Sequence, residues 1–229
     1  LCYGNPEKPE QMWAFVEGVR GINDACKKIT LKHSPENPTP IVAGNVSFYN
    51  ESKNKSIPPS PIVSCLGKIK NVKKTVTMSF KEEGSSIIMI GQRKDELGGS
   101  IFYSLYNEVG KNLPKPNLPE ARNQIYAITD CIDQELVLAC HDISEGGVAT
   151  ALAEMTFGNA IGLTALIESN LSNDKILFSE TGGFLLEAKN SQLELIRSIF
   201  ENHNLNLYVI GQTGGKRIKI NKVIDVLVN

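Results

Sequence analysis

The sequence has little of what marks a membrane, nucleic-acid-binding or disulfide-stabilised protein. It contains no apolar run close to the ~20 residues that a membrane-spanning helix needs. Lysine and arginine (24) nearly balance aspartate and glutamate (25), so the net charge of -1 gives no strong field for attracting polyanions. Aromatic residues make up only 7% and do not alternate with basic residues. We therefore expect neither nucleic acid nor a membrane as a partner.

Cysteine and histidine are sparse and scattered. No CxxC pair occurs, no histidines have metal-ligand spacing, and no Walker-type phosphate loop or Ser-His-Asp arrangement can be recognised. Most cysteines stand in apolar stretches, which is typical of buried, reduced thiols. No signal peptide precedes the first motif. The sequence thus predicts a soluble cytoplasmic protein, and its 229 residues can bury a substantial core.

The chain opens on Leu-Cys-Tyr without a methionine, followed by a Gly-Asn-Pro turn. Because these first residues resemble the end of a strand already under way, we expect a piece of a longer chain.

Helical and strand patterns are mixed without strict βαβ alternation, which predicts an α+β protein of two units, residues 1–83 and 84–229, divided at a Lys-Glu-Glu-Gly hinge. Apolar spacing predicts helices over 10–29, 120–133 and 191–202, and a helix containing Phe102 to Val109. Strands are expected at 41–49, 62–69, 75–79, 86–90, 136–140, 163–167, 184–188, 208–211 and 217–220.

The segment Gly-Asn-Val-Ser-Phe-Tyr-Asn-Glu at residues 44–51 is the most informative one. Gly44 lacks a Cβ, so a phosphate could approach the main chain there. Asn45 offers a hard neutral oxygen of the kind that Mg²⁺ accepts beside phosphates and water. In a strand, Asn45 and Ser47 would share one face. The alternative is an ordinary half-buried strand with polar residues facing solvent.

A second segment, His-Asp-Ile-Ser-Glu-Gly-Gly at residues 141–147, stands where a strand leads into a helix. Ser144 suits an N-cap, unpaired amides at the helix start could hold phosphate, and Asp142 could hold a bridging metal. Capping plus a Gly-Gly turn explains the same residues without a ligand. The segments 97–100 and 179–183 have similar glycine pairs, which turns alone would explain.

Taken in order, four motifs resemble the second half of the PurL family, the synthetases of phosphoribosylformylglycinamidine formation within the aminoimidazole ribonucleotide synthetase superfamily. They are Tyr-Gly-Asn-Pro-Glu-Lys-Pro at 3–9, the segment at 44–51, Glu-Leu-Gly-Gly-Ser at 96–100 and the segment at 141–147. The resemblance implies an aminoimidazole ribonucleotide synthetase-like fold, in which an N-terminal α/β unit with a mixed sheet precedes a C-terminal α+β unit.

The resemblance also implies an ATP-dependent ligase of purine biosynthesis. In this family ATP activates the amide oxygen of formylglycinamide ribonucleotide, and ammonia from a glutaminase subunit then gives the amidine. Gly44 would contact ATP, Asn45 would bind Mg²⁺ and Ser47 would contact the ribonucleotide. Asp142 and Ser144 match positions that bind Mg²⁺ and nucleotide at an auxiliary site in some members.

The chain departs from the family pattern in two respects that concern activity. The N-terminal half of the synthetase, with its catalytic histidine, is absent, and Gly183 stands where an arginine is common. We therefore expect the chain to be inactive alone, and to assemble with the N-terminal half, the glutaminase and small accessory subunits, or as a homodimer. Two alternatives remain: a non-catalytic scaffold with an auxiliary nucleotide site, and a superfamily member with another substrate, such as a carbonyl-thiolating or selenium-activating enzyme.

Overall fold

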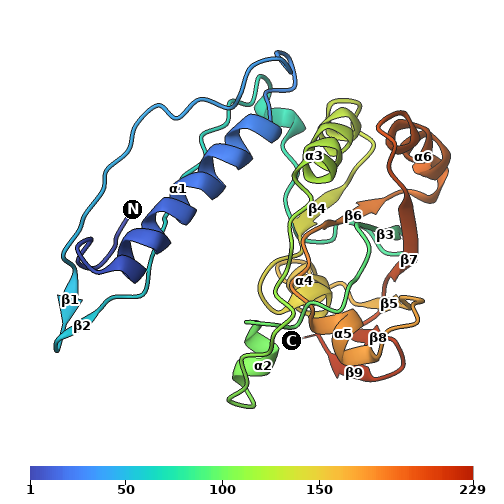
Figure 1. Ribbon diagram of the computed structural model, residues 1–229. Helices are drawn as coiled ribbons and strands as arrows, with labels where there is room; N and C mark the ends of the chain where they lie inside the picture. The colour runs from blue at the N-terminus through green and yellow to red at the C-terminus, as the bar shows by residue number, and fades with distance from the viewer. Residues whose placement is uncertain (229) are drawn as a thin grey trace. The chain divides into compact units, whose positions relative to one another are not determined.

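The computed structural model describes residues 1–228, which form two compact units, Leu1–Lys70 and the chain from Asn71 onward (Figure 1). The first unit holds one long helix, α1 (Pro9–Lys28), and a two-stranded antiparallel hairpin, β1 (Glu51–Ser52) and β2 (Lys55–Ser56). Helix α1 begins with a proline in its first turn and ends on two lysines, both of which suit those positions.

The second unit is built on one mixed sheet with helices on its faces. Its helical elements are η1 (Val72–Lys74), α2 (Ile101–Ser104), α3 (Leu118–Asp133), α4 (Gly147–Glu154), α5 (Asn173–Phe178), η2 (Asn190–Gln192) and α6 (Leu193–Asn202). Its strands are β3 (Ser86–Ile90), β4 (Ala139–Asp142), β5 (Leu163–Ala165), β6 (Phe184–Ala188), β7 (Leu207–Thr213), β8 (Arg217–Ile220) and β9 (Ile224–Leu227).

The strands lie in the order β4-β6-β3-β7-β5-β8-β9, and every neighbouring pair is antiparallel except β5 with β8. The α+β class is therefore as predicted. The mixed sheet, however, lies in the second unit, whereas we expected one in the first.

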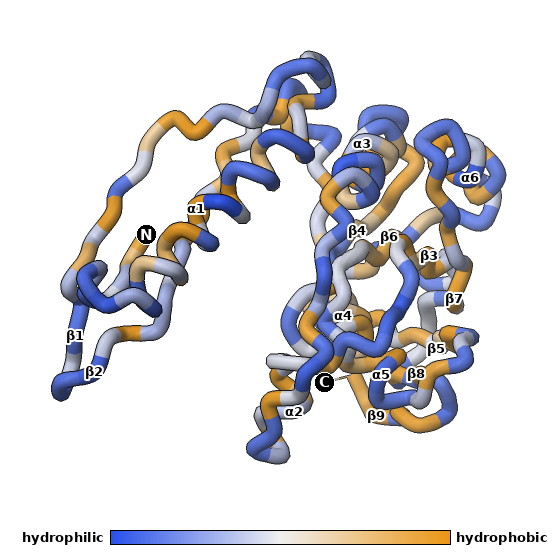
Figure 2. Tube along the Cα trace, viewed as in Figure 1, coloured by the Kyte–Doolittle hydropathy of each residue, from blue (hydrophilic) through white to orange (hydrophobic). Residues whose placement is uncertain are grey.

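Strand β3 is buried on both faces, which explains its unbroken run of apolar residues. Ile87 and Met89 contribute to one core cluster with α4 and α5, and Ile88 and Ile90 contribute to a second cluster with α3 and α6. Alternate side chains of a strand point to opposite faces, so one short strand contributes to both cores. Figure 1 shows α3 beside α6 and α4 beside α5, and Figure 2 shows apolar colours along the strands between them.

Most elements with a strong periodic pattern are confirmed. Helices α1, α3 and α6 and strands β3, β6 and β8 match their predicted ranges within about two residues, a normal spread for element ends. The predicted helix after Ser100 is only the four-residue α2, because Asn107 adopts a left-handed backbone (φ 56°) that a helix cannot continue through. The short elements α5, β1, β2 and β9 were not predicted.

Three predicted strands are wrong. Residues 41–49 form only an isolated bridge at Ser47, residues 75–79 form only one at Thr77, and residues 62–69 form no regular element. A strand needs a hydrogen-bonded neighbour along its length, and among residues 1–228 these segments have little such pairing. A prediction based only on β-branched and aromatic residues therefore gave too many strands.

The two units divide at Lys70 and Asn71, earlier along the chain than the hinge that we predict near Gly84. Phe80 shows why residues 71–83 group with the second unit, since its side chain is fully buried and its amide donates to Met155 O at 2.8 Å. The buried carboxylate of Glu187 also accepts from the Lys81 amide at 2.7 Å. The functional boundary near Gly84 stays a prediction.

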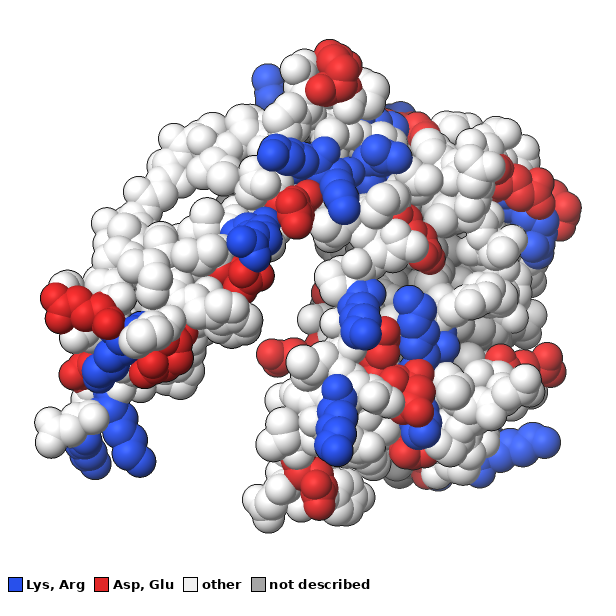
Figure 3. Space-filling model, in the orientation of Figure 1, with Lys and Arg blue, Asp and Glu red and all other residues white. Residues whose placement is uncertain are grey.

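No helix within residues 1–228 combines the length and apolarity needed to cross a bilayer. On the face drawn in Figure 3, basic and acidic side chains are interspersed, in keeping with the near-zero net charge.

Candidate functional site

The segment at residues 44–51 is held against the start of the chain within the first unit. Cys2 bridges Ser47 in parallel and Ser60 in antiparallel fashion. The Tyr3 amide donates to Ser47 O at 2.9 Å, and the Ser47 amide donates to Leu1 O at 2.9 Å. These bonds connect two of the four motifs found in the sequence, residues 3–9 and 44–51, so both belong to one local structure.

Aromatic packing fixes the other side of this segment. The ring of Phe48 packs edge-on against Phe15 of α1, with 5.0 Å between centroids, and Phe15 packs edge-on against Tyr3 at 5.4 Å. At the end of the segment, Glu51 forms a 2.6 Å ion pair with Lys8 of the first motif. Phe48 is thereby fixed by packing against α1.

Gly44, Asn45 and Ser47 lie together, as their spacing requires. A Cβ built on Gly44 would meet nothing within 4 Å, so the backbone there is open to a ligand. Asn45 is exposed, and its side chain makes no hydrogen bond within residues 1–228; its carbonyl accepts from the Leu1 amino group at 2.8 Å. Ser47 is half-buried, with its Oγ 3.2 Å from Asn50 Oδ1. These three residues present open backbone, a free amide oxygen and an oriented hydroxyl.

The segment at residues 141–147 lies in the second unit and runs from β4 into α4. The prediction that Ser144 is the N-cap is wrong: Gly146 is the N-cap, with a left-handed φ of 76°. Ser144 is exposed, and its carbonyl accepts from the Gly147 amide at 3.1 Å in a turn. Gly147 is also left-handed (φ 69°), and two such residues in succession strongly favour glycine.

The Gly146 and Gly147 amides at the start of α4 are already hydrogen-bonded, whereas we expected unpaired amides that could hold phosphate. The carboxylate of Glu180 accepts from the Gly146 amide at 3.0 Å and, through the same oxygen, from the Ile101 amide at the start of α2 at 2.8 Å. A negative side chain therefore already accepts from these two amides. Glu180 belongs to the segment 179–183, which we interpreted only as a turn, and no sequence pattern revealed this role.

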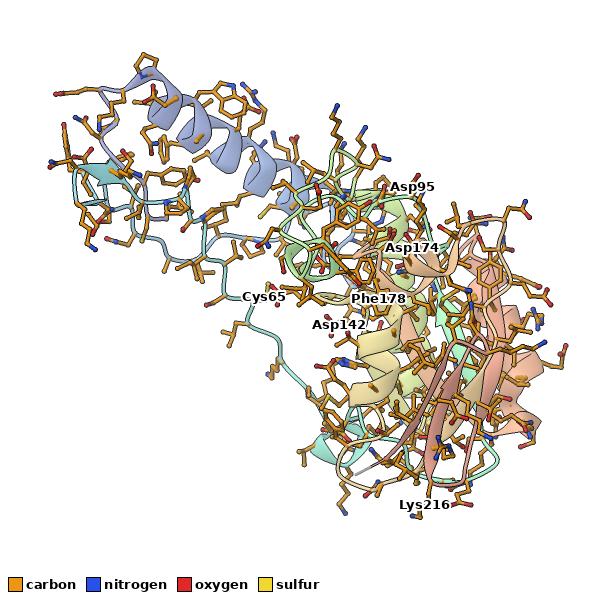
Figure 4. The ribbon with its side chains drawn as sticks, turned by 90° about the horizontal axis from the view of Figure 1, so that it is seen from below. Cys65, Asp95, Asp142, Asp174, Phe178 and Lys216 are labelled. Atoms are coloured by element: carbon orange, nitrogen blue, oxygen red, sulfur yellow. The ribbon has the colours of Figure 1, made fainter. Side chains whose placement is uncertain are left out.

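Asp142 lies at the end of β4 next to the start of α4 (Figure 4). Its side chain is 62% exposed, and its Oδ1 lies 3.2 Å from Nδ1 of His141, whose Nε2 is 2.8 Å from Oε2 of Glu154. Burial, together with the Asp142 charge, raises the pKa of the Cys140 thiol to about 12, so this thiol stays protonated at neutral pH. Asp142 thus offers an exposed carboxylate at the end of an edge strand of the sheet.

Asp142 also lines a hollow of about 830 Å³ in the second unit, together with Glu180, Thr181 and Gly182. Arg93 is a buried residue, 7% exposed, and its guanidinium donates to Thr181 O at 2.7 Å and to Gly182 O at 2.8 Å, which fixes this wall of the hollow. Burial lowers the pKa of Arg93 to about 10. Within residues 1–228, no cluster of three or more His, Cys, Asp or Glu residues could hold a metal by itself.

Comparisons with known proteins agree with the motifs. Residues 82–222 match the family described as AIR synthase related protein, C-terminal domain. The chain is 42% identical over 214 residues to the phosphoribosylformylglycinamidine synthase subunit PurL of Methanothrix thermoacetophila, covering 92% of this chain and 28% of that protein. The PurL subunit of Thermoplasma volcanium is 40% identical over 226 residues, covering 97% and 28%. The chain therefore spans less than a third of the length of these relatives.

Solved structures share the fold. Thermotoga maritima PurL complexed with FGAR superposes with a TM-score of 0.60 and 18% identity, covering 69% of this chain and 29% of that one. The PurL complex with ATP gives 0.54 and 20%, covering 69% and 27%. The PurLQS structure from the same organism gives 0.57 and 17%, again covering 69% and 27%.

Proposed function

This chain belongs to the AIR synthase related protein family, and we propose that it supplies part of the ATP-dependent ligase that converts formylglycinamide ribonucleotide to its amidine in purine biosynthesis. The observation that carries the proposal is the set of backbone hydrogen bonds between residues 1–4 and 45–50. These bonds fix the segment that contains Gly44, Asn45 and Ser47. Relatives named as PurL match nearly the whole chain, which supports the same substrate class.

In the proposed site each residue has a separate task. The open backbone at Gly44 would admit a phosphate of ATP, the free amide oxygen of Asn45 would hold Mg²⁺, and the Ser47 hydroxyl would contact the ribonucleotide. An exposed, neutral oxygen fits the small number of protein ligands that Mg²⁺ takes when phosphates and water complete its shell. The metal, when bound, would neutralise charge on the phosphates during transfer.

Asp142 and Ser144 would form part of an auxiliary nucleotide site in the second unit. The exposed Asp142 carboxylate suits a metal that bridges to phosphate, and the exposed Ser144 hydroxyl can donate to a nucleotide oxygen. Because Glu180 already accepts from the Gly146 amide, phosphate would bind at these side chains rather than at the start of α4.

The proposal is tested by phosphate release with formylglycinamide ribonucleotide, ATP, Mg²⁺ and ammonia. An intact synthetase that contains this segment is expected to turn over, whereas the 229-residue chain alone is expected to be inactive, because it matches only 28% of its relatives' length. Turnover near ~1 s⁻¹ by the chain alone would contradict this division of the site.

We further propose that the first unit associates through apolar surface, with the remaining part of the synthetase or as a homodimer, alongside a glutaminase and small accessory subunits. Trp13 of α1 is 67% exposed, Val42 is 86% exposed and Leu66 is 97% exposed. Solvent-exposed apolar groups of this size favour partner binding. Light scattering on this chain at ~100 μM is expected to give a dimer or larger assembly. A clean monomer would contradict the homodimer and leave association with the remaining part of the synthetase.

A further inference from the structure

The side chain of Asn50 connects the two motifs of the first unit. Its Nδ2 donates to Tyr3 O at 2.9 Å and to Ser47 O at 3.0 Å. Both partners are carbonyl oxygens, which only accept, so the amide must turn its NH₂ group toward them. Each of its two hydrogens then has a partner.

This assignment fixes the role of the Ser47 hydroxyl. Ser47 Oγ lies 3.2 Å from Asn50 Oδ1 and 3.1 Å from Asn50 Nδ2. Because the carbonyls of Tyr3 and Ser47 take the two Nδ2 hydrogens, the hydroxyl proton of Ser47 is donated to Asn50 Oδ1. The lone pairs of Ser47 Oγ are then left to accept from a ligand.

The backbone beside Asn50 is held in a rare conformation. Tyr49 has a φ of 59°, a left-handed value that is an outlier for a bulky aromatic residue. Its amide donates to Gly4 O at 3.0 Å, and the Asn50 amide donates to Tyr3 O at 3.2 Å. This turn brings the Asn50 side chain back over Ser47, and strained backbone of this kind is concentrated at functional sites.

We propose that Asn50 is a positioning residue that presents the Ser47 hydroxyl as a hydrogen-bond acceptor, so that Ser47 binds an N–H or O–H group of the substrate and not a phosphate oxygen. The inference rests on the proposed contact of Ser47 with formylglycinamide ribonucleotide. That substrate carries amide N–H groups and ribose hydroxyls, whereas the oxygens of an ionised phosphate are acceptors.

Two substitutions separate this role from local structure. Asn50→Ala removes both the donors and the acceptor. Asn50→Asp keeps an acceptor for the Ser47 hydroxyl but sets a carboxylate against two carbonyl oxygens, so it should lower the melting temperature of this chain at least as much as Asn50→Ala. The affinity for the substrate should follow the opposite order, with Asn50→Asp binding formylglycinamide ribonucleotide more tightly than Asn50→Ala.

The measurement is KM for formylglycinamide ribonucleotide in an intact synthetase that contains this segment. We expect KM to rise about 10-fold in Asn50→Ala and only about 3-fold in Asn50→Asp, with KM for ATP unchanged in both. Asn37→Ala is the matched control, because Asn37 donates to the hydroxyl of Ser34 at 2.7 Å with the same three-residue spacing, in an exposed loop. It should leave both KM values unchanged.

Ser47→Ala separates the inference from the proposed function. If Ser47→Ala raises KM for the ribonucleotide but Asn50→Asp is impaired as much as Asn50→Ala or more, Asn50 acts only in local structure and the inference is overturned. If neither Asn50 variant changes KM, it is overturned as well. If Ser47→Ala itself leaves this KM unchanged, the proposed substrate contact fails and the inference fails with it.

Discussion

Replacing Asn45 with alanine in an intact synthetase is expected to lower kcat/KM for Mg²⁺-ATP by about 100-fold, while KM for formylglycinamide ribonucleotide stays within about threefold of its original value. The Asn45 side chain is exposed and makes no hydrogen bond within residues 1–228, so its removal breaks no internal hydrogen bond that the structure shows. A loss of activity would therefore report on a ligand. Steady-state kinetics with ATP and Mg²⁺ varied separately would measure it.

Two companion variants sharpen this test. Asn45→Asp keeps a hard oxygen at the same place and should retain much of the activity lost in Asn45→Ala. Ser47→Ala should have the opposite effect: it should weaken binding of the ribonucleotide by about 1–3 kcal/mol and leave the use of Mg²⁺-ATP unchanged. Unchanged kinetics in Asn45→Ala and Ser47→Ala would mean that residues 44–51 serve only local structure.

Substituting Gly147 by alanine is expected to destabilise the second unit by roughly 3 kcal/mol or more. Gly147 has a φ of 69°, and a Cβ at this position would lie 2.6 Å from Leu177 O and 2.8 Å from the carbonyl carbon of Phe178. Both neighbours are backbone atoms of α5, so neither can rotate away. The substitution would push α5 from the start of α4 and disturb the turn that carries Ser144.

Gly182→Ala is the control for this prediction. Gly182 lies in the same unit, has no left-handed φ, and a Cβ there would meet nothing within 4 Å. Its effect on the free energy of unfolding should stay within about 0.5 kcal/mol, as for most surface substitutions. Urea unfolding followed by circular dichroism measures the stability of both variants. Equal unfolding midpoints for Gly147→Ala and Gly182→Ala would show that α5 can move to accommodate a Cβ at Gly147.

Strong local patterns were sufficient to predict the framework of the second unit. The continuous apolar run of β3 is explained by burial on both faces, and the apolar spacing of α6 is explained by its packing beside α3. Such patterns depend on residues close together in the chain, and burial enforces them. The sequence also placed Gly44, Asn45 and Ser47 together, because a spacing of one to three residues leaves little choice.

Patterns that depend on a distant partner were misjudged. Residues 41–49 have strand-forming side chains, yet Tyr49 turns left-handed and only Ser47 bridges to Cys2. Composition states that a segment suits a sheet but not whether a neighbouring strand exists to pair with it. The same limit hid the start of α4, where Gly146 is the N-cap in place of the Ser144 that local rules favour, and where the distant Glu180 accepts from the Gly146 amide.

By itself, then, the sequence determined the α+β class, the periodic helices and strands, and the motifs that place this chain in its family. Only the tertiary structure decided that the Asn50 side chain donates to the Tyr3 carbonyl, and that one Glu180 oxygen accepts from the amides at the starts of both α2 and α4. These bonds join groups 47, 79 and 34 residues apart. Backbone amides and carbonyls occur at nearly every residue, so no pattern of side chains reveals which of them folding will bring to a given side chain.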